Sequence, residues 1–183
     1  MDLVTISENV LRDCLGAKAG EEVLIVTDDT RVSIAQALYE GAKNLGCEAM
    51  MTVMKERKLN GEEPPKAVAE AMKAADIVIC PTAKSLTHTN ARIQAVAAGT
   101  RVATMPGITE EMFSQGAMTA DYSAVAELTA KITEMLTECQ TARIEKDGCV
   151  LTLDLEGRKG IPSPGVYREA GQSGNLPSGE AYI

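Results

Sequence analysis

The chain has 183 residues, no Trp, one Phe and a formal net charge of −8. Sequence-independent nucleic-acid binding needs a basic face, so this charge excludes nucleic acid as a partner. The sequence contains no apolar run of ~18 residues and no basic stretch followed by an apolar core at its start, so we expect no membrane span, no secretory signal and a cytoplasmic location.

The length suits one domain and part of another. Five cysteines occur, an odd number, and no two of them have the C-x-x-C spacing. Most lie among apolar residues. We therefore expect buried thiols in a reducing compartment rather than disulfides or a zinc site.

The first 140 residues alternate between apolar runs and amphipathic stretches. Apolar runs between polar turns predict strands at residues 23–26, 47–54, 77–80 and 102–105. Helical periodicity predicts helices at residues 6–15, 31–45, 65–75, 88–98 and 123–139, with a short helix beginning at Thr109. This order predicts an α/β fold with a mostly parallel, Rossmann-like sheet flanked by helices.

Local signals suggest where these elements begin and end. Ser7 is the expected N-cap of the first helix, Asp29 or Thr30 that of the second, and Thr87 that of the helix near residue 88. Pro81 is expected to end the third strand. The turn after the first strand carries two acids in place of a glycine-rich loop, which argues against a dinucleotide cofactor.

The pattern changes after Gln140. Residues 142–146 and 150–155 alternate with period two around Asp147-Gly148, which predicts a β-hairpin. We therefore place a boundary near residue 140, with an α/β domain over 1–140 and the opening of a β-rich, metal-binding domain over 141–183. Residues 158–174 show no clear element, and Glu180 to Ile183 begin like a strand.

His88 is the only histidine, and it follows the third strand on the carboxyl-end side of the predicted sheet. Ligands of open α/β folds bind at that end. Two interpretations stay open: His88 is adjacent to a helix cap without a role, or it is a catalytic acid/base or substrate contact. Lys84 is a candidate for binding a carboxylate there, and Asp28 and Asp29 either hold a cation or cap the next helix.

Glu180 follows the segment Gly174-Asn175-Leu176-Pro177-Ser178-Gly179, which is rich in turn formers. A rigid loop before a carboxylate suits a metal ligand, whereas the alternative is a solvated surface glutamate. One carboxylate binds a divalent ion weakly, so we expect no firmly bound metal in this chain.

The segment from Gly174 to Ile183 resembles the "GNLPSGE" segment of the aminopeptidase T-type metalloaminopeptidases. Residues 85–89, 103–109 and 151–158 resemble the same family, so the likeness runs through most of the chain. The resemblance implies that Glu180 is one ligand of a two-metal site. The other ligands of that family have no counterpart in this sequence.

From this resemblance we expect the N-terminal part of an aminopeptidase that uses divalent zinc, cobalt or manganese, acts on peptides and forms a homodimer; this part alone is expected to be inactive. The related dihydroxypyridine ring-cleaving dioxygenases use a histidine of the first domain near their substrate, and His88 resembles a candidate for that position. Two alternatives stay open: a mononuclear-iron dioxygenase of the same architecture, and a non-catalytic small-molecule-binding module.

Overall fold

The computed structural model describes residues 2–183 and divides into two compact units. The first unit comprises Met1–Ala120 and Gly165–Pro177, and the second comprises Asp121–Pro164 and Ser178–Ile183. The domain boundary expected near residue 140 stays a prediction. By its contacts the chain divides after Ala120, and the segment Gly165–Pro177 returns to the first unit.

The first unit alternates strands and helices. Its elements are α1 (Leu3–Asn9), a π-helical turn (Val10–Cys14), β1 (Glu22–Asp28), α2 (Val32–Asn44), β2 (Glu48–Met54), α3 (Lys66–Ala74), β3 (Ile77–Thr82), α4 (Asn90–Ala97), β4 (Arg101–Pro106), α5 (Glu110–Ser114), a 3₁₀ turn (Gly116–Thr119) and β8 (Ser173–Asn175).

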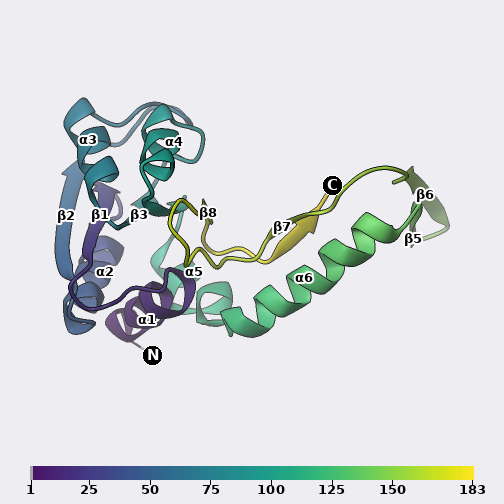
Figure 1. The fold of residues 1–183 in the computed structure, drawn as a ribbon, viewed down its shortest axis with the longest axis horizontal. Coiled ribbons are helices and arrows are strands. Elements are labelled where there is room, and N and C mark those ends of the chain that lie inside the picture. Colours follow the sequence, from purple (N-terminus) through teal and green to yellow (C-terminus); the bar gives the residue numbers. More distant parts are fainter. Residues whose placement is uncertain (1) are drawn as a thin grey trace. The chain divides into compact units, whose positions relative to one another are not determined.

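These strands form one parallel sheet in the order β2-β1-β3-β4-β8. Figure 1 labels four of them, β2, β1, β3 and β8. The chain places β2 on one side of β1 and then β3 on the other side. The direction in which strands are added to the sheet therefore reverses between β1 and β3. Such a reversal places the loops after β1 and β3 side by side at the carboxyl end of the sheet. The α/β fold with a mostly parallel, helix-flanked sheet is confirmed.

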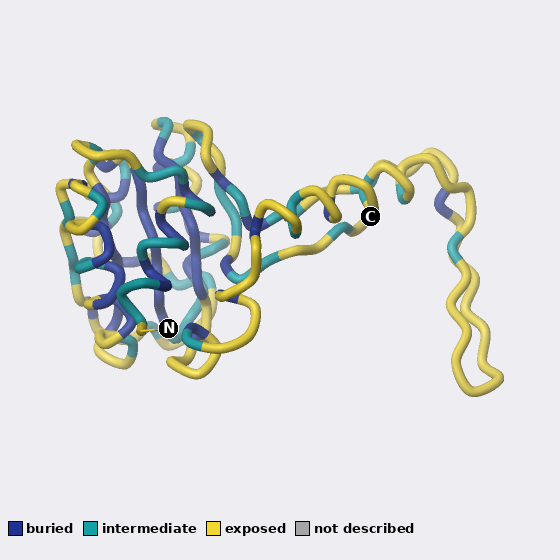
Figure 2. The backbone as a smooth tube through the Cα atoms, turned by 90° about the horizontal axis from the view of Figure 1, so that it is seen from below, coloured by how far each residue is buried: buried dark blue, intermediate teal, exposed yellow. Residues whose placement is uncertain are grey.

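Both faces of the sheet are covered, as the buried strands in Figure 2 show. Leu24 and Val26 of β1 belong to one apolar cluster with Val68 and Met72 of α3 and with residues of α4. The alternate residues of β1 are fully buried as well. Side chains of consecutive strand residues point to opposite faces, which explains why β1, β3 and β4 read as continuous apolar runs.

Three of the expected helix caps are wrong. Asp2, not Ser7, caps α1 by accepting the Thr5 N–H at 2.9 Å. Helix α2 begins at Val32 without a side-chain cap. Helix α4 begins at Asn90, and the hydroxyl of Thr89 caps it by accepting the Arg92 N–H. The caps of α1 and α4 lie five and two residues from the positions expected, because several Ser, Thr and Asp residues compete near each helix start.

Pro81 does not end β3, which continues to Thr82. Pro81 pairs with Met105 of β4, and its carbonyl accepts the Thr27 hydroxyl at 2.8 Å. The register of β3 with β1 ends at Ile79. The proline therefore lies beyond the β1 ladder, where its missing N–H costs no hydrogen bond to that strand.

The segment 165–177 docks on the first unit along its whole length. Tyr167 N–H donates to the Cys14 carbonyl at 2.7 Å, and Gly171 N–H donates to the Gly99 carbonyl at 2.9 Å. Strand β8 then pairs with β4, with Gly174 opposite Ala103. The expectation of no element over 158–174 is thus wrong at its end, where β8 begins, and also at Ile161–Ser163, a short strand of the second unit.

The second unit contains α6 (Tyr122–Glu138), β5 (Thr141–Lys146), β6 (Cys149–Asp154), β7 (Ile161–Ser163) and β9 (Glu180–Tyr182). β5 and β6 form the expected hairpin, with positive φ of 51° at Asp147 and 79° at Gly148, which suits a type I′ turn. β7 and β9 form a second antiparallel pair. The strand expected from Glu180 onward is confirmed, whereas β7 was not expected.

No helix of residues 2–183 is both long enough and apolar enough to cross a membrane.

Candidate functional site

A cluster of hydroxyl and amide side chains lies at the carboxyl end of the parallel sheet in the first unit. Ser85 and Thr87 belong to the loop after β3, Thr104 is near the end of β4, and Asn175 ends β8. We call these four residues the polar cluster. Parallel strands end at the same edge of a sheet, which is why residues so far apart in sequence meet here.

The side-chain oxygen of Asn175 is the centre of the polar cluster. It accepts the Thr104 hydroxyl at 2.7 Å and the Thr87 hydroxyl at 2.9 Å. Ser85 in turn donates its hydroxyl to Thr87 Oγ1 at 2.8 Å. The hydroxyls of Thr87 and Thr104 thus both donate to one amide oxygen, which holds Asn175 in a single orientation, and Ser85 supports this arrangement through Thr87.

Two longer side chains, those of Arg92 and Tyr167, hold the backbone around the polar cluster in place. Arg92 Nε donates to the Thr87 carbonyl at 2.8 Å, and Arg92 Nη1 donates to Ser173 Oγ at 3.1 Å. The Tyr167 hydroxyl donates to the Asn175 carbonyl at 3.0 Å. The backbone of β8 and the loop of Thr87 are therefore fixed to each other by side chains as well as by the sheet.

The amide nitrogen of Asn175 is the polar group that this arrangement leaves available. Within residues 2–183 no group accepts a hydrogen bond from Nδ2, and Asn175 is exposed. Because its oxygen is held by two hydroxyls, its two N–H groups face away from them. The site can therefore donate to an acceptor oxygen of a ligand.

His88 lies next to the polar cluster in sequence but takes no part in its hydrogen bonds. It is exposed, and no group in the described part of the chain bonds to its imidazole. Thr89, the following residue, is buried and caps α4. The role of His88 as a catalytic acid/base or substrate contact stays a prediction.

Asp28 is buried at the reversal of the sheet and joins the loops after β1 and β3. Its Oδ1 accepts the Thr30 N–H at 3.0 Å, and its Oδ2 accepts the Ala83 N–H at 2.6 Å. Asp29 accepts the Glu56 N–H at 3.0 Å. Both carboxylates thus accept hydrogen bonds from backbone N–H groups of loops, and neither caps α2. Lys84, half-buried, lies in the same loop as Ala83.

Glu180 is in the second unit, where it opens β9 opposite Ser163 of β7. Gly179 before it lies against α6, where a Cβ would come within 2.8 Å of Val125 Cγ1. Ser178 donates to the Ser163 carbonyl at 2.8 Å. The backbone at Glu180 is therefore held firmly within this unit, while its carboxylate is exposed.

A metal ion needs more donors than Glu180 supplies. Among the described residues, 2–183, there is no group of three or more His, Cys, Asp or Glu side chains that could hold one. A single exposed carboxylate offers at most two oxygens to an ion that prefers six or more ligands, or at least four. These residues alone therefore do not form a complete metal site.

The cysteines divide into two groups by burial. Cys14, Cys47 and Cys80 are buried, Cys139 and Cys149 are exposed, and all five are free thiols. Burial raises the pKa of both Cys14 and Cys80 to about 12. A thiol with so high a pKa stays protonated near neutral pH, so neither suits a nucleophile or metal ligand.

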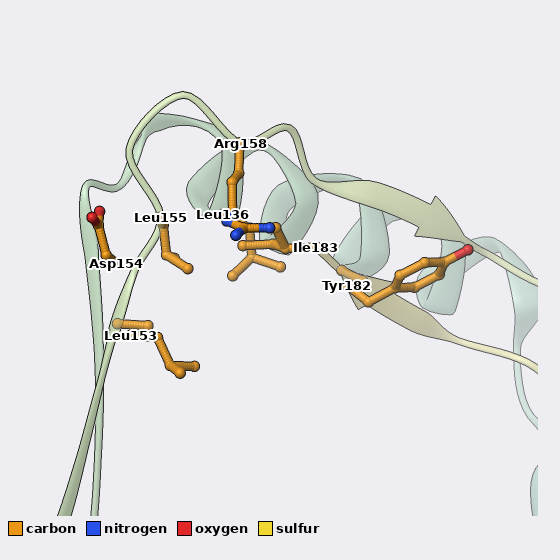
Figure 3. Close-up of a pocket in the computed structure, with 9 residues that line it drawn as sticks. Leu136, Leu153, Asp154, Leu155, Arg158, Tyr182 and Ile183 are labelled. Atoms are coloured by element: carbon orange, nitrogen blue, oxygen red, sulfur yellow. The ribbon is translucent and has the colours of Figure 1, made fainter.

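The second unit also contains an open hollow of about 390 Å³ (Figure 3). Its walls come from α6, the base of the β5–β6 hairpin and β9, and are mostly apolar: Leu136, Ala142, Leu153, Leu155, Ala181, Tyr182 and Ile183. Asp154 and Arg158 are its charged members. Asp154 accepts the Glu156 N–H at 3.0 Å. The hollow offers apolar contact but few polar groups that converge on one point.

Sequence reasoning did not identify Thr104 and Asn175 as site residues. Both lie inside segments that resemble the aminopeptidase T-type family, residues 103–109 and 174–183, and that was the available signal. Thr104 directly precedes Met105-Pro106-Gly107, a sequence that favours a turn, and Asn175 lies in the turn-rich loop before Glu180. Neither position by itself indicates a site residue. Their meeting depends on the pairing of β8 with β4, which residues 158–175 gave no reason to expect.

Comparison with known proteins gives one family match and several structural ones. The family model described as NicX, 2,5-dihydroxypyridine 5,6-dioxygenase, matches residues 2–183. No curated protein is significantly similar to the chain in sequence.

Two solved structures share the fold. The first is a 2,5-dihydroxypyridine dioxygenase from Pseudomonas putida KT2440, with a TM-score of 0.70, 18% identity, and 98% of this chain covering 54% of that one. The second is wild-type AmpT from Thermus thermophilus, with a TM-score of 0.63, 17% identity, and 98% of this chain covering 60% of that one. The chain thus spans little more than half the length of each.

Proposed function

This chain belongs to the NicX family of 2,5-dihydroxypyridine 5,6-dioxygenases, and we propose that it forms part of a metal-dependent enzyme that opens a hydroxylated pyridine ring with dioxygen. The observation that carries this proposal is the match of the family model to residues 2–183. It favours the iron-dependent dioxygenase, which the sequence left as an alternative, over the aminopeptidase expected first.

The polar cluster supplies the recognition that such a substrate needs. A dihydroxypyridine can be bound through its two hydroxyl groups, each of which donates and accepts hydrogen bonds, and through its ring nitrogen. In our proposal Asn175 Nδ2 donates to one of these oxygens, while Thr87 and Thr104 hold the amide in place. An amide fixed before the ligand arrives loses little conformational freedom on binding.

His88 keeps the role implied by the resemblance to the ring-cleaving dioxygenases, and Glu180 keeps the metal-ligand role implied by the resemblance to the aminopeptidases. His88 would exchange a proton with a ring hydroxyl, since an imidazole can both donate and accept one. Glu180 would be one oxygen ligand of the metal, and the remaining ligands would come from outside residues 2–183. The metal, when bound, would bring the ring and dioxygen together.

Metal-dependent peptide hydrolysis is the second candidate. The likeness of residues 174–183 to the "GNLPSGE" segment and the fold shared with AmpT favour it. A peptide carbonyl would accept from Asn175 as readily as a ring oxygen does, so the polar cluster does not separate the two candidates.

The test compares both activities in the natural protein that carries this chain. We expect oxygen consumption with 2,5-dihydroxypyridine and ferrous iron, and no release of N-terminal residues from peptides with zinc, cobalt or manganese. Asn175→Ala should raise the KM about tenfold, the loss of one hydrogen bond of about 1.4 kcal/mol, whereas the exposed Asn90→Ala should leave it unchanged.

The opposite pattern, peptide release without oxygen consumption, would contradict the dioxygenase and support the peptidase. Neither activity, with 2,5-dihydroxypyridine still bound, would instead leave a non-catalytic binding module.

A further inference from the structure

The β5–β6 hairpin has almost no cover in the second unit. Eleven of its twelve strand residues are exposed and one is half-buried. One face carries the cross-strand pairs Ala142–Leu153 and Ile144–Leu151, with Ile144 58% exposed and Leu151 53% exposed. A two-stranded hairpin with an uncovered apolar face is only marginally stable in water.

The outer edge of β5 is also unpaired. Within residues 2–183, β5 pairs only with β6, so the backbone N–H and C=O groups along its other side have no ladder partner. Such an edge is a template for another strand unless its side chains oppose pairing.

The charges on β5 favour one particular partner strand. Arg143 and Glu145 flank Ile144, lie on the face opposite to it and form an ion pair with each other. If a second copy of β5 pairs antiparallel about a two-fold axis through Ile144, Arg143 lies opposite Glu145 of the second copy, twice. The four charges then alternate in sign around a square.

Neighbouring registers are unfavourable. An axis through Arg143 would place two arginines opposite each other, and an axis through Glu145 would do the same with two glutamates. A shift of one residue would bring Ile144 opposite a charged residue and turn the apolar faces of the two copies to opposite sides.

We propose that β5 is the interface for a second copy of this chain, and that the two hairpins join into a four-stranded sheet in the order β6-β5-β5-β6. Each Ile144 then lies between Leu151 of its own hairpin and Ile144 of the other copy. Exposed ion pairs add little affinity. The backbone ladder and the Ile144 contact hold the dimer, while the charges select its register and make it weaken at high salt.

Sedimentation of the purified chain tests this proposal. The wild type should approach twice its monomer mass of 19.4 kDa at high micromolar concentration. Arg143→Glu and Glu145→Arg each place like charges opposite each other, so each variant alone should sediment as a monomer. An equimolar mixture of the two should associate again, as should the double swap in one chain.

Glu127→Arg on α6 is the matched control, because Glu127 pairs with Lys131 on an exposed surface outside the hairpin. It should leave the dimer intact. Circular dichroism of every variant separates loss of association from loss of folding.

A cross-link locates the axis. In a Cys139→Ser, Cys149→Ser background, Ile144→Cys should oxidise to a covalent dimer, because the two residues face each other across the axis. Val150→Cys, on β6, should not. A wild type that stays monomeric at all concentrations overturns the proposal, and so does a dimer that ignores both charge reversals and the cross-linking position.

Discussion

At the scale of single residues, Asp28 shows how a buried carboxylate can hold the first unit together. In the sequence, the two acids after the first strand suggested either a cation site or a helix cap. The Asp28 carboxylate instead accepts backbone N–H groups from the loops after β1 and β3. An acidic residue at a strand end therefore has a third role, to hold two loops together, which sequence alone does not distinguish from the others.

Cys80 gives a prediction about pH. Burial raises its pKa from 9.0 to about 12 in the folded chain. Unfolding exposes the thiol, which then loses its proton at lower pH than in the folded state. The free energy of unfolding should therefore fall as pH rises from 9 toward 12, by at most ~1.4 kcal/mol per pH unit for this group.

Urea denaturation of wild type and Cys80→Ala between about pH 8 and 10.5 checks this. The variant loses stability at every pH because it leaves a small cavity, but its stability should decline less steeply above pH 9. Cys149→Ala, at an exposed position, should keep the wild-type slope. Equal slopes in wild type and Cys80→Ala would show that the buried thiol does not contribute.

At the scale of elements, the sequence predicted those strands and turns that depend on a local pattern of residues. The runs Val23–Val26, Ile77–Cys80 and Val102–Met105 became central strands because only a sheet covered on both sides accepts continuous apolar residues. The Asp147-Gly148 hairpin followed from its turn residues, whose positive φ few others adopt.

β8 could not be predicted in the same way. Ser173, Gly174 and Asn175 all favour turns, and nothing local marks them as a strand. Tertiary contacts override this preference: β4 supplies a ladder, and Tyr167 covers Gly174 closely. The polar cluster could not be predicted for the same reason, because Thr104 and Asn175 come together only when β8 pairs with β4.

Gly174 gives the prediction at this scale. A Cβ there would overlap with the Tyr167 hydroxyl group. Gly174→Ala should therefore push β8 away from β4 and cost about 1–3 kcal/mol of stability. Amide hydrogen exchange should quicken at Leu176, whose N–H donates to the Thr104 carbonyl.

Tyr167→Ala in the same chain tests the cause. Removing the ring makes room for the new methyl group, so the double variant should lose less stability than the two single changes added together. Additive losses would mean that the Tyr167 ring is not what excludes a side chain at position 174.

At the scale of the whole molecule, the two units differ in how much each buries. The first contains nearly all of the buried apolar residues, whereas the strands of the β5–β6 hairpin are exposed almost throughout (Figure 2). Local stability follows buried contacts. Hydrogen exchange should thus be slowest in β1, β3 and β4 and much faster in β5 and β6.

Exchange followed by mass spectrometry at low protein concentration checks this order. At high concentration the amides of β5 alone should become slower, if a second copy pairs with that strand. Hairpin protection equal to that of β1 at every dilution would contradict the contrast between the units.

The late return of the chain to its first sheet has a consequence for synthesis on the ribosome. Ala103 of β4 meets its partner only when Gly174 has emerged. Until then β4 has an unpaired edge, which can form a ladder with a neighbouring nascent chain. A fragment that ends at residue 140 would keep this unpaired edge permanently, and we expect it to precipitate where the 183-residue chain does not.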